Sequence, residues 1–154
     1  MNKATRAAIL FIAQGAYAGR SPVAPGTAGT VVGVVLYLGI KNLPPGYYLV
    51  VCVLAILVGM WAAGHAESIL GQTDSPSIVI DEIAGFLTAM FMVPQRWFFI
   101  VFGFLLFRLF DITKPWPLKR LQDLHGGPGV MLDDVGAGIY TNVLLQLAAH
   151  FIVR

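Results

Sequence analysis

Charge is scarce in this chain of 154 residues. Only 12% of the residues are charged, whereas 57% are hydrophobic, and the mean hydropathy is +0.76. A soluble domain of this size exposes too much surface to be solvated by so few charged groups. The composition therefore favours a membrane protein over a soluble helical protein with buried central helices.

Cysteine and clusters of basic residues are also lacking. The single cysteine, Cys52, has no partner for an intrachain disulfide, and it stands among Val and Leu, where a packed apolar side chain is expected. The net charge is only +2, and no run of basic residues alternates with aromatics. The sequence therefore predicts no nucleic-acid partner.

Long hydrophobic blocks are present instead, separated by polar breaks. Blocks of this kind are typical of membrane-spanning helices. We expect an all-α, multi-span membrane bundle that forms one domain, residues 1–154, with about four transmembrane helices plus an N-terminal interfacial helix. The blocks are residues 27–40, 47–63, 83–93, 97–107 and 135–153.

The N-terminal segment has the order of a signal peptide, with Lys3 and Arg6 before an apolar stretch and then "AYA". The apolar stretch is short, and Gln14 interrupts it. We therefore expect a retained helix that is interfacial or partly inserted, rather than a cleaved leader.

The basic residues orient the bundle. If the blocks cross the bilayer in turn, the breaks at 19–27, 65–77 and 111–134 share one side, and most Lys and Arg residues lie there. Cytoplasmic loops are enriched in Lys and Arg, so this side is predicted to be cytoplasmic. The opposite side carries Lys41, Arg96 and Arg154.

Two blocks are too short to cross a bilayer. Blocks 83–93 and 97–107 each hold eleven residues, whereas a crossing needs about 20. We expect the first to extend back through "IVIDE" and the second forward through "RLFDIT", as far as Pro115. The charged residues that would then lie on helix ends are Asp81, Glu82, Arg108 and Asp111.

Carboxylates all lie on the predicted cytoplasmic side. An ionisable group at the bilayer centre costs at least ~2.5–3.5 kcal/mol and by default marks a functional site. Asp133 and Asp134 are expected just before the last helix, where one of them is explained as a helix N-cap. Capping does not explain the "DE" of "IVIDEIAGF", which has apolar residues on both sides. The eight are Glu67, Asp74, Asp81, Glu82, Asp111, Asp123, Asp133 and Asp134.

Acids on separate segments suit Mg²⁺, which prefers oxygen ligands and is commonly held by one or two carboxylates plus a substrate phosphate. The histidines lack ligand spacing, so zinc is not expected. The alternative is a structural salt-bridge cluster with Arg108, Lys114 and Arg120. The expected metal ligands are Asp81, Glu82, Asp133 and Asp134.

"FRLFDITKPWP" places Arg108, Asp111 and Lys114 within an arc of about 120° if it is helical. Such a row beside a metal suits a phosphate, because the two cations neutralise its oxygens while Asp111 binds metal or orients a nucleophile. "GRSPVAPGTAGT" is a weaker candidate, in which a helix start near Thr27, assisted by Arg20, binds an anion; a sharp surface turn explains it equally well.

"SPVAPGTAGT", "IVIDEIAG", "FRLFDITKPWP" and "GGPGVMLDDVGAG" follow one another in this order, and from about residue 15 to 145 the sequence resembles the phosphatidylglycerophosphatase A family. The resemblance implies a bacterial inner-membrane enzyme that depends on Mg²⁺. It further implies hydrolysis of the terminal phosphate of phosphatidylglycerophosphate, which yields phosphatidylglycerol, at the cytoplasmic face. The identity of the lipid rests on the resemblance alone.

The expected mechanism is attack of water on the phosphorus of a phospholipid that stays in the bilayer, with a phospho-aspartate intermediate left open. Catalytic roles are expected for Arg108, Asp111, Lys114 and Asp134, and substrate binding for Arg20, Thr27, Arg108 and Lys114. The rival class is a transporter or channel with an intramembrane acidic ion site, although blocks 27–40 and 47–63 contain almost no polar residues. The sequence predicts no particular oligomeric state.

Overall fold

The chain folds into a bundle of helices. The computed structural model describes residues 1–121, 124 and 126–152, and no strand occurs among them, which confirms the expected all-α class. Asp123 and Arg154 lie outside the described residues. The elements are α1 (Lys3–Ala13), the 3₁₀ turn η1 (Ala18–Arg20), α2 (Pro25–Ile40), α3 (Pro45–Leu70), α4 (Ile80–Ala89), α5 (Trp97–Thr113), α6 (Leu118–Leu121) and α7 (Gly127–Ile152).

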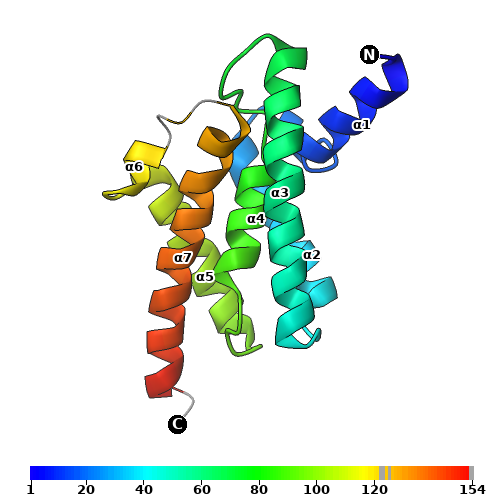
Figure 1. Cartoon of the computed structure of the whole chain (residues 1–154). Coiled ribbons are helices and arrows are strands. Elements are labelled where there is room, and N and C mark those ends of the chain that lie inside the picture. The colour runs from blue at the N-terminus through cyan, green and yellow to red at the C-terminus, as the bar shows by residue number, and fades with distance from the viewer. Residues whose placement is uncertain (122–123, 125, 153–154) are drawn as a thin grey trace.

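Helices α3 and α7 are the long helices of the bundle, with α4 between them and with α2 and α5 behind in this view (Figure 1). Helices α3 and α7 each hold 26 residues, about 39 Å of helix, and on length and composition each of the two can cross a membrane. The starts of α2, α4 and α7 and the end of α5 lie toward one end of the bundle, and the turns at 41–44 and 90–96 lie at the other (Figure 1). This is the alternation of ends that the polar breaks predicted.

Helix α4 is shorter than expected. It begins at Ile80, as the extension through "IVIDE" predicted, but it ends at Ala89 after ten residues, about 15 Å or half of a bilayer core. Side chains of α7 explain this end. Asn142 Nδ2 donates to the carbonyl oxygens of Ala89 (2.9 Å) and Phe91 (2.7 Å), and these bonds satisfy carbonyls that the helix leaves free.

Small residues allow neighbouring helices to enclose α4. On α2, Gly29 faces Val79 and Gly33 faces Phe86. On α7, a Cβ at Gly138 would lie 2.3 Å from the carbonyl oxygen of Gly85. Close contacts therefore form on two sides of α4, and seven of its ten residues are buried.

Helix α7 begins earlier than the sequence indicated. Asp133 and Asp134 were expected to precede the last helix, but α7 starts at Gly127, so both lie inside its second turn and neither is a cap. Pro128 fits the first turn of a helix, where no N–H donor is needed. Gly127 lies against α3, since a Cβ there would lie 1.9 Å from the carbonyl oxygen of Met60. The glycines of "GGPG" serve close packing as well as turning.

Helix α1 is present as expected and packs on α3 through the buried side chains of Ile9 and Ala13. The carbonyl oxygen of Ala13 accepts a hydrogen bond from the Val79 N–H (2.9 Å), which ties the end of α1 to the segment before α4. Cys52 is buried and forms no disulfide in the described part of the chain, as predicted.

Replacing Gly85 with alanine is expected to loosen the contact between α4 and α7. The added Cβ would lie 2.6 Å from the Asp134 carbonyl oxygen and 2.7 Å from the Phe107 ring. Overpacking of this kind costs about 1–3 kcal/mol of unfolding free energy, which is measured as a lower unfolding midpoint in detergent. Gly39→Ala is the control, because a Cβ at Gly39 on α2 has nothing within 4 Å. Equal midpoints for the two variants would contradict the packing described.

Candidate active site

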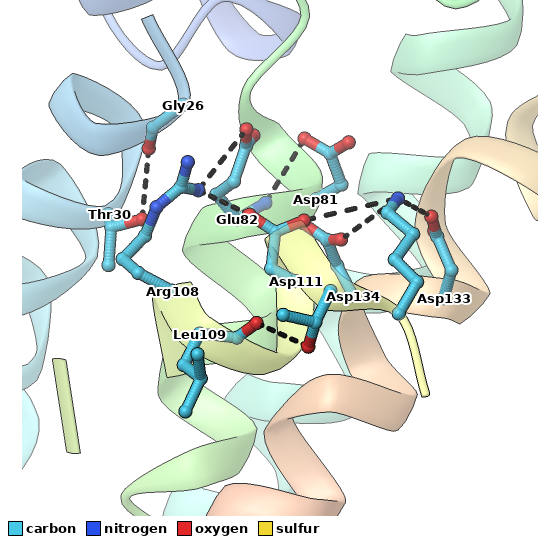
Figure 2. Close-up of polar contacts among 11 residues, drawn as sticks. Gly26, Thr30, Asp81, Glu82, Arg108, Leu109, Asp111, Asp133 and Asp134 are labelled. Atoms are coloured by element: carbon cyan, nitrogen blue, oxygen red, sulfur yellow. Dashed lines mark hydrogen bonds and ion pairs between the residues drawn. The ribbon is translucent and has the colours of Figure 1, made fainter. Parts of the chain in front are cut away.

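A cavity of about 360 Å³ opens where the starts of α2 and α4, the end of α5 and the second turn of α7 meet. Figure 2 shows the charged side chains of α4, α5 and α7 pointing toward one another at this point. The structure thus brings together the three segments that the sequence predicted would converge. Among the described residues, the charged ones lining the cavity are Asp74, Asp81, Glu82, Asp111, Asp133 and Asp134 with Arg108 and Lys114.

Three of the acids form a close group. Asp81 and Glu82 stand in the first turn of α4 and Asp134 in α7, and each offers a carboxylate oxygen within 4.8 Å of the other two. The positive end of the α4 dipole favours the two acids at its start. Asp81 and Asp134 are only 9% and 2% exposed. Buried like charges at this separation repel one another strongly unless a cation lies between them.

The group fits a hard divalent cation. Mg²⁺ takes oxygen ligands and is often held by a few carboxylates. Glu82 Oε2 is buried and has no hydrogen-bond partner among the described residues, although a buried carboxylate oxygen normally has one. A cation bound by the group would supply that missing partner. Asp81, Glu82 and Asp134 are three of the four ligands predicted from the sequence.

Asp133, the fourth predicted ligand, points to a different partner. Its Oδ2 accepts a hydrogen bond from Lys114 Nζ, and the side chain is 3% exposed. Its Oδ1 is buried without a partner in the described part of the chain. Asp133 therefore holds Lys114 in place, and its role as a metal ligand stays a prediction.

The cation–anion–cation row on α5 converges as predicted. Arg108 Nη1 donates to Asp111 Oδ2 and lies 3.8 Å from Glu82 Oε1 (Figure 2). Lys114 Nζ lies 3.9 Å from Asp111 Oδ1 and 4.0 Å from Asp134 Oδ1. Lys114 was expected to continue the helix, but α5 stops at Thr113 and Lys114 adopts a left-handed conformation with φ 41°. Pro115 follows and prevents the helix from continuing.

Lys114 remains a cation. Burial alone would lower the pKa of its ammonium group, but the hydrogen bond and charge of Asp133, together with the charges of Asp134 and Asp111, outweigh burial and raise that pKa. A lysine that is protonated at neutral pH stabilises negative charge and does not act as a general base.

The two predicted substrate-binding residues near α2 lie outside the cavity lining in the described part of the chain. Arg20 Nε donates to Gln14 Oε1 (2.8 Å), and its guanidinium stacks on the Tyr17 ring. Thr27 stands in the first turn of α2. Its neighbour Gly26 lines the cavity instead, and a Cβ there would lie 2.3 Å from Glu82 Oε1.

A polar network that the sequence reasoning missed holds the segment in front of α4. Gln14 is 3% exposed, and its Nε2 donates to Ser77 Oγ (3.1 Å) while its Oε1 accepts from Arg20. Ser77 Oγ also contacts Ser75 Oγ (3.1 Å). The network fixes residues 75–77, which lead into Asp81 and Glu82. The signal in the sequence was Gln14 itself, a polar residue inside an apolar stretch.

Lys114→Met is expected to destabilise the protein, because it leaves Asp133 buried beside a group that cannot pair with its charge. Breaking such a pair costs about 3–5 kcal/mol, measured as a lower unfolding midpoint in detergent. Adding Asp133→Asn removes the unpaired charge, so the double variant should be more stable than Lys114→Met alone. A double variant whose loss equals the sum of the single losses would show that the two side chains are not coupled.

The chain is similar to known phosphatases along most of its length. The sequence model of the family described as phosphatidylglycerophosphatase A matches residues 11–149. The phosphatidylglycerophosphatase A of Escherichia coli K12 is 33% identical over 142 residues, which cover 91% of this chain and 83% of that protein. That of Haemophilus influenzae Rd is 36% identical over 145 residues, which cover 89% and 86%.

A third relative carries a different name. A Bacteroides thetaiotaomicron protein named "Putative phosphatidylinositol-3-phosphatase" is 37% identical over 147 residues, 90% of this chain and 92% of that protein. No solved structure matches the chain. The family match covers all four sequence motifs and every charged residue that lines the cavity. The chain belongs to the phosphatidylglycerophosphatase A family and is a phosphatase enzyme.

Proposed function

We propose that this chain is a Mg²⁺-dependent lipid phosphatase that hydrolyses the terminal phosphomonoester of phosphatidylglycerophosphate to phosphatidylglycerol and phosphate. The observation that carries the proposal is the cavity in which Asp81, Glu82 and Asp134 stand beside the paired cations Arg108 and Lys114. Family membership supports the reaction class and favours an enzyme over the transporter or channel alternative.

Four of the carboxylates take two roles in the proposed reaction. Asp81, Glu82 and Asp134 would hold Mg²⁺, which supplies positive charge against the phosphoryl oxygens and acidifies water. Asp111 is held by Arg108 and lies near Lys114. That position suits a carboxylate that orients an attacking water and accepts its proton.

Arg108 and Lys114 bind the phosphoryl group. Each is engaged by an aspartate in the structure, so each is already oriented before substrate arrives. Arg108 has a planar fork that contacts two oxygens at once, and Lys114 contributes a compact charge. Cations fixed in this way stabilise the negative charge that develops in the transition state without first having to reorganise. Arg20 and Thr27 would support the substrate only indirectly, through the loop and the helix start on which they stand.

The exposed side chains support a placement in the membrane. Large apolar residues are exposed on α2, α3, α5 and α7, as in Val35, Leu57, Phe102 and Leu147. An apolar surface that continues over four helices suits hydrocarbon better than water. We place these four helices across the bacterial inner membrane with α4 enclosed among them. The cavity then faces the cytoplasm, where basic residues are most frequent.

A second substrate class comes from one relative. The name of the Bacteroides protein points to a phosphate on an inositol ring. The same cavity chemistry acts on either phosphomonoester, so the head group decides between the two classes.

Asp81→Asn, Glu82→Gln and Asp134→Asn are each expected to lower kcat at least about 100-fold, because loss of one fixed charge from a catalytic site acts on that scale. The assay is phosphate release from phosphatidylglycerophosphate by purified protein in detergent, with and without Mg²⁺. In addition, Mg²⁺ at 100 times its Kd should stabilise the wild type by about 2.7 kcal/mol, and the variants less.

Glu67→Gln is the matched control, since Glu67 lies on α3 near the same end but is not among the described residues that line the cavity. It should retain activity. Full activity without Mg²⁺, or in all three cavity variants, would refute the proposed site.

The wild type is expected to hydrolyse phosphatidylglycerophosphate with a kcat/KM at least about tenfold above that for phosphatidylinositol 3-phosphate, a difference of about 1.4 kcal/mol. An inositol ring needs more room beside Arg108 than a glycerol does, and the cavity holds only about 360 Å³. Both lipids are presented with the same acyl chains in the same detergent, and initial rates are compared. The reverse preference would assign this chain the activity in the name of its Bacteroides relative.

A further inference from the structure

An apolar groove runs between α2 and α5 on the outer surface of the bundle. Its volume is about 250 Å³. Three of its residues, Val31, Val101 and Leu105, are 49%, 47% and 57% exposed, so the groove is open to the surroundings. The lining residues are Val31, Val34, Ile100, Val101, Phe104 and Leu105. The groove lies outside the cavity in which the proposed reaction takes place.

The groove leads to the active site along α5. Successive residues of a helix are 100° apart, so Phe104 and Arg108 stand one above the other on the same face. Five residues of α5 form a stripe that lies within an arc of about 100° on this face. It contains Val101, Phe104, Leu105, Arg108 and Ile112. The stripe is therefore apolar at the groove and carries the phosphate-binding arginine one turn further on.

Helix α2 matches this arrangement. Thr27, Val31 and Val34 fall within an arc of about 60°, so the α2 wall of the groove leads up to the first turn of the helix. There Gly26 meets Arg108, since a Cβ at Gly26 would lie 3.0 Å from both Nη atoms of the guanidinium. Figure 2 shows the Arg108 side chain beside Gly26 and Thr30. The first turn of α2, which lies beyond the groove wall along the helix, thus contacts the same arginine that follows the groove on α5.

The cavity also opens toward this side. Ile112 lines the cavity and is 71% exposed, and it lies on the same stripe of α5 as the groove residues. Arg108 Nε is buried without a partner among the described residues. The phosphate site and the apolar groove adjoin at Arg108. The cavity on one side of this residue is charged, and the groove on the other side is apolar.

We propose that the α2–α5 groove binds an acyl chain of the substrate lipid, so that the substrate enters sideways from the bilayer between these two helices. The inference rests on the proposed lipid phosphatase function and adds the path and the chain-binding site. The matching chemistry is that of a phosphomonoester lipid, whose phosphate reaches Arg108 while one chain follows the groove. From Ile100 to Leu105 the groove wall extends about 8 Å along α5, and Arg108 lies one turn beyond it, so an extended hydrocarbon chain can follow the wall up to the phosphate site.

The test fills the groove with a larger apolar side chain. Val31→Trp should raise the KM for a phosphatidylglycerophosphate with long chains about tenfold and leave the KM for its dihexanoyl form unchanged, because the short chains do not reach the groove. Val143→Trp is the matched control. Val143 is 51% exposed on α7 and does not line the groove, and this variant should behave as the wild type with both lipids. Equal KM changes for long and short chains, or none for either, would overturn the inference.

A second measurement is independent of turnover. A long-chain phosphatidylglycerophosphate with a photoreactive group in one acyl chain is crosslinked to the wild type, and labelled peptides are identified by mass spectrometry. Labelling concentrated at residues 27–34 and 100–108, and lost when unlabelled substrate competes, supports the groove. Labelling spread evenly over α3 and α7, or equal labelling by a diacylglycerol probe without phosphate, would show ordinary bilayer lipid and overturn it. If the wild type hydrolyses neither lipid, the proposed function fails, and the crosslinking result still decides the groove.

Discussion

The structure depends on the containment of like charges at the junction of four helices. Among the described residues, six carboxylates and only two cations line one cavity, and several of these carboxylates are almost fully buried. Such an excess of negative charge is costly at low dielectric. Two of the acids have buried oxygens without a partner. Further positive charge would balance this arrangement, and the divalent cation that we propose would supply it.

The short helix α4 makes this junction possible. It is enclosed by glycine contacts with α2 and α7, and its far end is held by Asn142 of α7. Because α4 does not run the full height of the bundle, its first turn lies within the bundle rather than at the tip. Asp134 lies seven residues into α7, about 10 Å below the helix start, and meets α4 at that level. The acids thus line a recess below the start of α7.

Much of the site could be predicted from the sequence because charge in an apolar chain is conspicuous. The positions of Asp81, Glu82, Arg108, Asp111 and Lys114 on helix ends followed from block lengths and from the proline stop after α5. Asp81 and Glu82 form the acidic group together with Asp134, and Arg108, Asp111 and Lys114 form the row on α5. Their grouping is a geometric result, whereas the bound ion remains a proposal.

The rest depended on packing that one sequence does not display. A glycine required by a turn and a glycine required by close helix contact look the same, so "GGPG" was interpreted as part of a loop although Gly127 begins α7 against Met60. The end of α4 is set by amide side chains from another helix, which local sequence cannot reveal. The positive charge of Arg20 suggested a substrate-binding role, whereas in the structure its side chain contacts Gln14 and Tyr17.

The most direct test of the account is a crystal structure of the protein soaked with Mn²⁺, a cation with the same preference for oxygen ligands that can be located by anomalous scattering. The account predicts an anomalous peak bonded to carboxylate oxygens of Asp81, Glu82 and Asp134. No peak there, or a peak only at surface carboxylates while the three side chains keep the positions described, would contradict the claim that this acidic group is a metal site.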